Sequence, residues 1–130
     1  MNEEELAKKF QFFEKQINAL QGEISAIDTA IEDMKKISFG LEELKGKTGE
    51  EIFAQIGKGL FVKAKLLDES ILLDTGGKNF VKKSIDETKI TIKKQEKKLG
   101  KIKKEVEDDL QKLDTELVKT MNEFNKENPK

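Results

Sequence analysis

The sequence of 130 residues contains no cysteine, no histidine and no arginine. Without cysteine there can be no disulfide and no thiolate metal site. Without histidine, no nucleophile has an imidazole to activate it, and any metal site would need oxygen ligands alone. No Asp/Asn/Gly loop of the calcium-binding type occurs. We therefore expect neither an enzyme nor a protein that carries a metal or another cofactor.

Long hydrophobic runs are also missing, and charges of the two signs nearly cancel. The formal net charge is −1, although 39% of residues are charged, so no overall field favours nucleic acid or anionic lipid. No segment resembles a signal peptide or a membrane span. We expect a soluble, cytoplasmic protein without membrane or nucleic-acid partners. The hydrophobic fraction of 35% is low for a globule. It suits a pair of long helices, in which about two positions in seven are buried.

What is present in the first third is a strict heptad repeat of apolar residues. Their spacing alternates between four and three, which marks the seam of a coiled coil, the stripe that faces a partner helix. We predict a coiled-coil helix within residues 1–46. The nine positions are Leu6, Phe10, Phe13, Ile17, Leu20, Ile24, Ile27, Ile31 and Met34.

A second apolar stripe predicts another coiled-coil helix within residues 84–126. Ser84 and Glu87 form a capping box at its start. Between Ile102 and Leu113 the spacing runs four, four, three, which predicts a stutter. The predicted core positions are Ile85, Thr88, Ile92, Gln95, Leu99, Ile102, Val106, Leu110, Leu113, Leu117, Met121 and Phe124.

The two stripes fit each other in an antiparallel arrangement. Pairing Leu41 with Ile85, and continuing so that partner numbers add to about 126, aligns apolar positions along both helices. This register brings the two ends of the chain together. It also places the lysine-rich residues 89–104 beside acids that include Asp28 and Glu42, although each exposed pair contributes at most about 1 kcal/mol.

Residues 50–83 change to the period of two that strands show. Leu60, Val62, Ala64 and Leu66 alternate with other residues, and glycine turns at residues 57–59 and 75–78 separate four short runs. We predict four strands in two consecutive hairpins. Because an isolated hairpin is marginally stable in water, we expect these strands to need strands from other chains.

Two chemical alternatives are weaker. Asp108 and Asp109 could form an acid/base pair, but adjacent helical residues point about 100° apart, so a solvated face is the simpler interpretation. The lysines of residues 89–104 could bind nucleic acid, but no aromatic residues are interleaved with them.

The order helix, two hairpins, helix resembles the prefoldin family, and in particular its archaeal alpha class, which has two hairpins. Residues 56–66, with the Gly57-Lys58-Gly59 turn, look like the family's first glycine-turn strand. Residues 72–77 followed by 80–84 look like its second hairpin and the entry to the last helix. The resemblance implies a mostly α, prefoldin-like fold with residues 1–130 as one domain. In that fold, two β-hairpins sit at the connecting end of a long antiparallel two-helix coiled coil.

The resemblance also implies a function and partners. The expected assembly is a hexamer of two alpha-class and four beta-class subunits, joined through the hairpins. The coiled-coil tips would hold unfolded client proteins without ATP and pass them to a group II chaperonin. The alternative is a self-assembling paralogue that forms a scaffold or filament.

Two sets of residues follow from that expectation. Phe12 differs from the rest of the tip because it faces away from the seam, where it would form an exposed apolar patch. The expected client-binding residues are Leu6, Phe10, Phe12, Phe13, Leu117, Met121 and Phe124. The expected assembly residues are Ile52, Ile56, Leu60, Val62, Ala64, Leu66, Ile71, Leu73, Phe80 and Val81.

Overall fold

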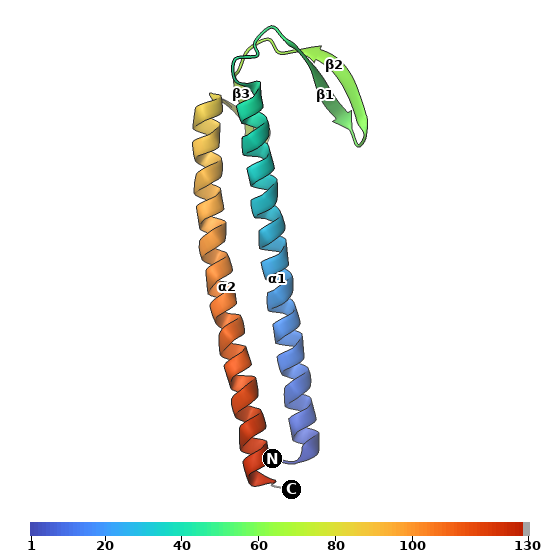
Figure 1. Ribbon diagram of the computed structural model, residues 1–130, viewed down its shortest axis with the longest axis vertical. Coiled ribbons are helices and arrows are strands. Elements are labelled where there is room, and N and C mark those ends of the chain that lie inside the picture. Colours follow the sequence, from blue (N-terminus) through green and yellow to red (C-terminus); the bar gives the residue numbers. More distant parts are fainter. Residues whose placement is uncertain (129–130) are drawn as a thin grey trace. The chain divides into compact units, whose positions relative to one another are not determined.

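A computed structural model describes residues 1–128 and contains two long helices with two β-hairpins between them in sequence (Figure 1). This confirms the predicted fold class. The elements are α1 (Glu3–Leu44), β1 (Glu51–Gly57), β2 (Leu60–Lys65), β3 (Ile71–Gly76), β4 (Asn79–Lys83) and α2 (Ile85–Glu127). Each observed boundary lies within a few residues of its predicted position.

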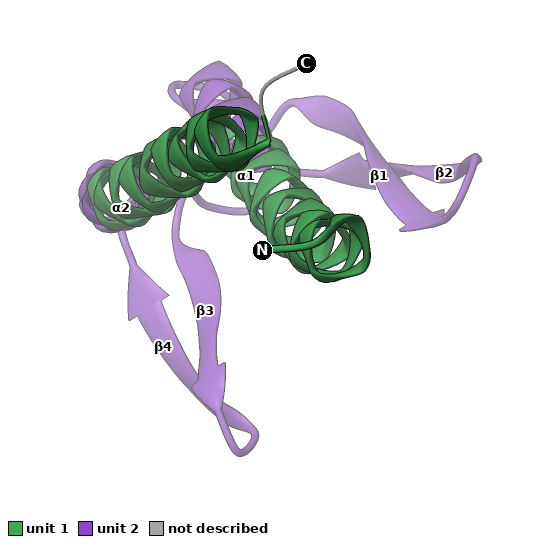
Figure 2. Cartoon of the chain, turned by 90° about the horizontal axis from the view of Figure 1, so that it is seen from below, with its two compact units in different colours: residues 1–31, 97–130 green, residues 32–96 purple. Residues whose placement is uncertain are grey.

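The chain divides into two compact units, each built from parts of both helices (Figure 2). Unit 1 contains residues 1–31 and 97–130, and unit 2 contains residues 32–96 with both hairpins. Within each unit a segment of α1 runs antiparallel to a segment of α2. That residues 1–130 form one domain remains a prediction.

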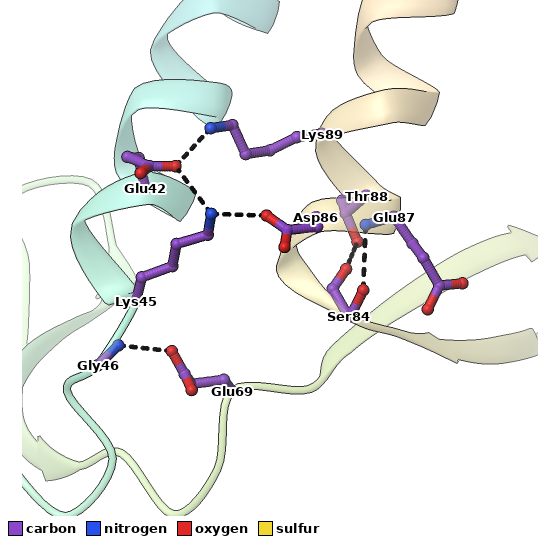
Figure 3. Close-up of polar contacts among 9 residues, drawn as sticks. All are labelled: Glu42, Lys45, Gly46, Glu69, Ser84, Asp86, Glu87, Thr88 and Lys89. Atoms are coloured by element: carbon purple, nitrogen blue, oxygen red, sulfur yellow. Dashed lines mark hydrogen bonds and ion pairs between the residues drawn. The ribbon is translucent and has the colours of Figure 1, made fainter.

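Both ends of α1 have polar caps. At its start the Asn2 side-chain oxygen accepts a hydrogen bond from the Glu5 amide (2.8 Å), and glutamates fill the first turn. At its end Gly46 has a φ of 73°, a left-handed conformation that glycine adopts without steric cost. The Gly46 amide donates to the Glu69 carboxylate (2.6 Å) in the loop before β3 (Figure 3).

The predicted seam of α1 is confirmed. All of its positions from Leu6 to Leu41 are buried or half-buried, while most residues between them are exposed. Phe13 and Leu41 are the most buried of these.

The seam of α2 differs from the prediction, because its burial keeps an unbroken alternation of four and three. Leu99, Val106 and Leu113 are seam residues that lie seven residues apart. The seam position between Leu99 and Val106 is occupied by half-buried Lys103, whereas its neighbour Ile102 is exposed. The predicted stutter is therefore wrong, as are the predicted core positions Gln95, Ile102 and Met121, which are exposed. Apart from Thr88 and Thr91, the α2 positions that are at least half-buried form two strings with a spacing of seven: Ile85, Ile92, Leu99, Val106, Leu113 and Thr120, and Lys89, Glu96, Lys103, Leu110, Leu117 and Phe124.

Lysine is tolerated at seam positions because its methylene chain is apolar and its ammonium group reaches the edge of the seam. Lys103 Nζ lies 2.7 Å from the Asp28 carboxylate in unit 1. In unit 2 Lys89 pairs with Glu42, and Lys45 Nζ lies 2.6 Å from Asp86 (Figure 3). In all three pairs the residue numbers add to 131, and not to the predicted value of about 126. The antiparallel direction is therefore confirmed in both units, but the predicted register is wrong by about one helical turn.

The hydrophobic core of unit 2 lies where the helices meet the second hairpin. Leu41, Ile85 and Ile92 are buried together, and half-buried Met34, Leu44 and Ile71 pack against them. Ser84 caps α2, since its Oγ accepts from the Glu87 amide (3.1 Å). The buried Thr88 hydroxyl donates to the Ser84 carbonyl (2.8 Å), so this buried polar side chain is hydrogen-bonded.

The two hairpins form separate two-stranded antiparallel sheets. In the first, Ile52 faces Ala64 and Ala54 faces Val62. In the second, Leu73 faces Val81. Its turn has positive φ at both Gly77 and Lys78 (59° and 63°), as a type I′ turn requires.

The ion pairs beside the core predict a loss of stability in acid. Lys89 lowers the pKa of Glu42, and Lys45 lowers the pKa of Asp86. A carboxyl whose folded pKa is depressed stabilises the fold above its unfolded pKa, and this contribution is lost as pH falls through the folded pKa.

We expect the thermal unfolding midpoint to fall as pH drops below about 4. The double variant E42Q/D86N should unfold earlier at pH 7 and show a shallower acid fall, whereas E43Q should match the parent. An unchanged acid fall in the double variant would contradict this account.

Candidate functional site

The helix ends in unit 1 carry an apolar groove of about 460 Å³. Four of its residues come from α1 and four from α2, in the register described above. We call it the helix-end groove; its lining residues are Phe10, Phe13, Glu14, Ile17, Leu117, Val118, Met121 and Asn122. Six of the eight are apolar, and the two polar residues are Glu14 and Asn122.

Phe13 separates this groove from a second hollow in unit 1. It is only 8% exposed, and its ring meets the Phe12 ring edge-on with centroids 6.3 Å apart. Phe12 is 60% exposed and lies among Lys8, Lys9, Glu116, Lys119 and Glu123, which line the second hollow of about 580 Å³. An outward aromatic ring is thus held by a buried one and surrounded by charges of both signs.

The seven expected client-binding residues differ in their exposure. Phe12 and Met121 are exposed, and Phe13 is buried in the seam. Leu6, Phe10, Leu117 and Phe124 are half-buried. The groove brings together Phe10, Phe13, Leu117 and Met121, and it does not include Leu6, Phe12 or Phe124.

Sequence reasoning missed Val118, which lines the groove and is exposed. It follows Leu117 directly and precedes Met121 by three residues, so both exposed side chains share one side of α2. A search for apolar residues flanking the seam, in addition to those within it, would have found it.

The ends of the chain are joined next to this site. The N-terminal amine lies 3.0 Å from the Glu127 carboxylate, which raises the pKa of that amine. The bond draws the first residue of the chain to the last turn of α2. Its contribution to stability is small because both groups face water.

The expected assembly residues gather mainly on one face of each hairpin. Strand alternation puts Ile52, Val62 and Ala64 on one face of the first, and Ile71, Leu73 and Val81 on one face of the second. Ile71 already packs against the core of unit 2. Of the ten, Ile56, Leu60, Val62, Phe80 and Val81 are exposed, and Ile52, Ala64, Leu66, Ile71 and Leu73 are half-buried.

The hairpins also expose apolar residues that sequence reasoning did not select. Phe53 is 71% exposed and Leu67 is 83% exposed, and Phe61 and Leu72 are exposed as well. Phe53 and Phe61 share the face of the first hairpin opposite to Ile52. So much bare apolar surface on two-stranded sheets is typical of a surface that another chain covers.

No group of three or more His, Cys, Asp or Glu side chains in residues 1–128 is placed to hold a metal ion. Nor is any helix there long and apolar enough to cross a bilayer.

Comparison with known proteins settles the family. Residues 13–130 match the family model described as Prefoldin subunit. The chain belongs to the prefoldin family. Members of this family are co-chaperone subunits and not enzymes.

Curated archaeal prefoldins assign the chain to the alpha class. It is 32% identical over 113 residues to prefoldin subunit alpha of Methanococcus maripaludis, covering 84% of this chain and 77% of that protein. It is 27% identical over 110 residues to prefoldin subunit alpha of Methanobrevibacter smithii, covering 84% and 70%. It is 28% identical over 99 residues to prefoldin subunit alpha 1 of Methanocaldococcus jannaschii, covering 76% and 68%.

A solved structure shares the prefoldin fold. It is the cryo-EM structure of filamentous PFD from Methanocaldococcus jannaschii, with a TM-score of 0.78 and 20% sequence identity. The alignment covers 87% of this chain and 95% of that chain.

The helix-end groove should bind an apolar fluorescent dye. Changing Met121 to Glu places a charge among its apolar walls, and we expect dye fluorescence to fall several-fold because burying an unpaired carboxylate is costly. The matched control is I90E, which charges another exposed apolar position of α2 outside the groove. Equal losses of fluorescence in the two variants would mean that the dye does not report on the groove.

Proposed function

We propose that this prefoldin subunit takes part in ATP-independent holding of unfolded polypeptides, and that its helix ends make the contact with the client. In this proposal the complex then delivers the client to a group II chaperonin. The observation that carries the proposal is the open apolar groove at the helix ends, with exposed Phe12 beside it. Non-native chains expose the apolar side chains that such a surface can cover.

The composition of the site suits binding without sequence preference. Met121 is flexible and polarisable, so it can adapt to side chains of different shape. Phe12 offers a large apolar surface whose ring is already positioned by Phe13. The surrounding lysines and glutamates are long, exposed and of both signs. They keep the free site hydrated while leaving the aromatic ring accessible.

Phe13 has a supporting role in this proposal. Because it is largely buried between the helices, a client in the groove can cover little of its ring unless the helix ends separate. Phe12, Val118 and Met121 need no such movement, since they are exposed already. They are therefore the proposed points of first contact.

The hairpins supply the proposed assembly surface. Each sheet has two strands whose outer edges can pair with further strands. We propose that they join beta-class subunits in a hexamer of two alpha-class and four beta-class chains. Self-assembly into a filament is the second candidate, favoured by the resemblance of the fold to a filamentous archaeal prefoldin. The mass of the purified chain, alone and with a co-expressed beta-class subunit, distinguishes the two.

The holdase proposal predicts that F12S weakens the suppression of aggregation of a denatured test protein. Full burial of a Phe side chain contributes about 1.5–3 kcal/mol, so its partial contact with a client should be worth about tenfold in affinity. Because Phe12 lies outside the seam, the variant should keep its helicity and its assembly mass. Light scattering of the test protein at several ratios of chaperone to client measures the effect.

The matched control is F39S, which removes another exposed Phe from α1, in unit 2. We expect F39S to hold clients as well as the parent. Full activity of F12S would rule out client capture at Phe12, and equal losses in F12S and F39S would show that exposed Phe residues act without regard to place.

A further inference from the structure

The apolar seam does not by itself specify how far α1 and α2 are shifted along each other. The seam of α1, like that of α2, consists of two strings of residues spaced by seven, and from Leu6 to Met34 both strings are apolar. If α2 moved along α1 by seven residues, each apolar residue of α1 would be replaced at the contact by another apolar residue. In α2 the string from Ile85 to Leu113 is also apolar with the same spacing. Register must therefore depend on residues that a shift of seven does change.

Such residues occupy the other string of α2. Lys89, Glu96 and Lys103 lie seven residues apart at half-buried seam positions, and their charges alternate. Lys89 pairs with Glu42 in unit 2, and Lys103 pairs with Asp28 in unit 1. The same register places Glu96 across from Lys35, although no ion pair forms between these two in the described structure.

A shift of seven residues in either direction would bring like charges together. Shifted one way, Glu96 would face Glu42 and Lys103 would face Lys35. Shifted the other way, Lys89 would face Lys35 and Glu96 would face Asp28. Because each helix is continuous, a shift would displace the pairs of both units by the same number of residues. Each wrong register therefore replaces attraction with repulsion between an exposed charge of α1 and a half-buried charge of α2, which is screened less than a charge on the open surface.

We propose that the alternating charges of Lys89, Glu96 and Lys103 against Glu42, Lys35 and Asp28 fix the register of α1 and α2. In so doing they align Phe10 and Phe13 with Leu117 in the helix-end groove. The alignment step rests on the proposed function, whereas the register itself does not. These six are positioning residues, and none of them lines the groove.

The test exchanges the two central charges, in the variant K35E/E96K. The exchange changes neither composition nor net charge, and it keeps opposite signs across the native register. It makes the α1 string wholly acidic and the α2 string wholly basic, so shifted registers become attractive as well. The control K36E/E105K exchanges the charges of two exposed residues outside these strings.

Cysteine pairs can measure the register, because the natural chain has no cysteine. I31C/L99C reports the native register, and I31C/V106C and I24C/L99C report the two shifts. Each pair is introduced into the full chain, assembled with its partner subunits, and oxidised. Intrachain disulfides are then identified by peptide mass. We expect K35E/E96K to raise the ratio of shifted to native product by roughly tenfold or more, and the control exchange to leave it at the parent's value.

A ratio that stays at the parent's value in K35E/E96K would overturn the proposal and would assign the register to the hairpin connection instead. A similar rise in K36E/E105K would also overturn it. Holdase activity distinguishes the register inference from the proposed role of the helix-end groove. A shifted register with full activity would refute the role of the helix-end groove while leaving the register inference intact.

Discussion

The pairing of α1 with α2 is the interaction on which the rest of the structure depends. With 35% hydrophobic residues, the chain has too few apolar side chains for a broad core, and it places them along one seam. The apolar residues drive the helices together without specifying their alignment. Partly buried charges at the edge of the seam supply that alignment, so attraction and specificity come from different residues. The helix-end groove exists because both requirements are met in the same register.

A narrow seam leaves apolar surface elsewhere, and the proposed function lies at that surface. In unit 1 it forms the helix-end groove and the outward Phe12. In unit 2 it covers both faces of the first hairpin and much of the second. A monomer in water would gain stability by burying these residues. Their exposure is the reason for the proposal that a folded subunit binds at the hairpins and an unfolded client at the helix ends.

Much of this arrangement is predictable from the sequence. The heptads of α1, the Ser84 cap and the glycine turns all have local signals, and each element was found near its predicted position. The error in α2 arose where a charged residue takes a seam position. Apolarity favoured Ile102 over Lys103, but the frame set by Leu99 and Val106 decides which side chain faces α1. Only the contact with Asp28 explains why a lysine suits that position.

The site was predictable in part for the same reason. Phe12 was recognised because it departs from the heptad pattern. Val118 was missed because, next to Leu117, it looks like an ordinary neighbour of the seam. Whether a residue beside the seam lines a groove depends on the side chains of the other helix. Sequence spacing along one helix does not contain that information.

Photo-crosslinking from single positions tests client capture at the helix ends most directly. A photoreactive amino acid is placed at residue 12 or residue 39 of the assembled complex, which is then exposed to light in the presence of a denatured, labelled client. The account predicts strong crosslinks to the client from residue 12 and few from residue 39, with both lost when the client is native. Equal crosslinking from the two positions, or none from residue 12, would contradict it.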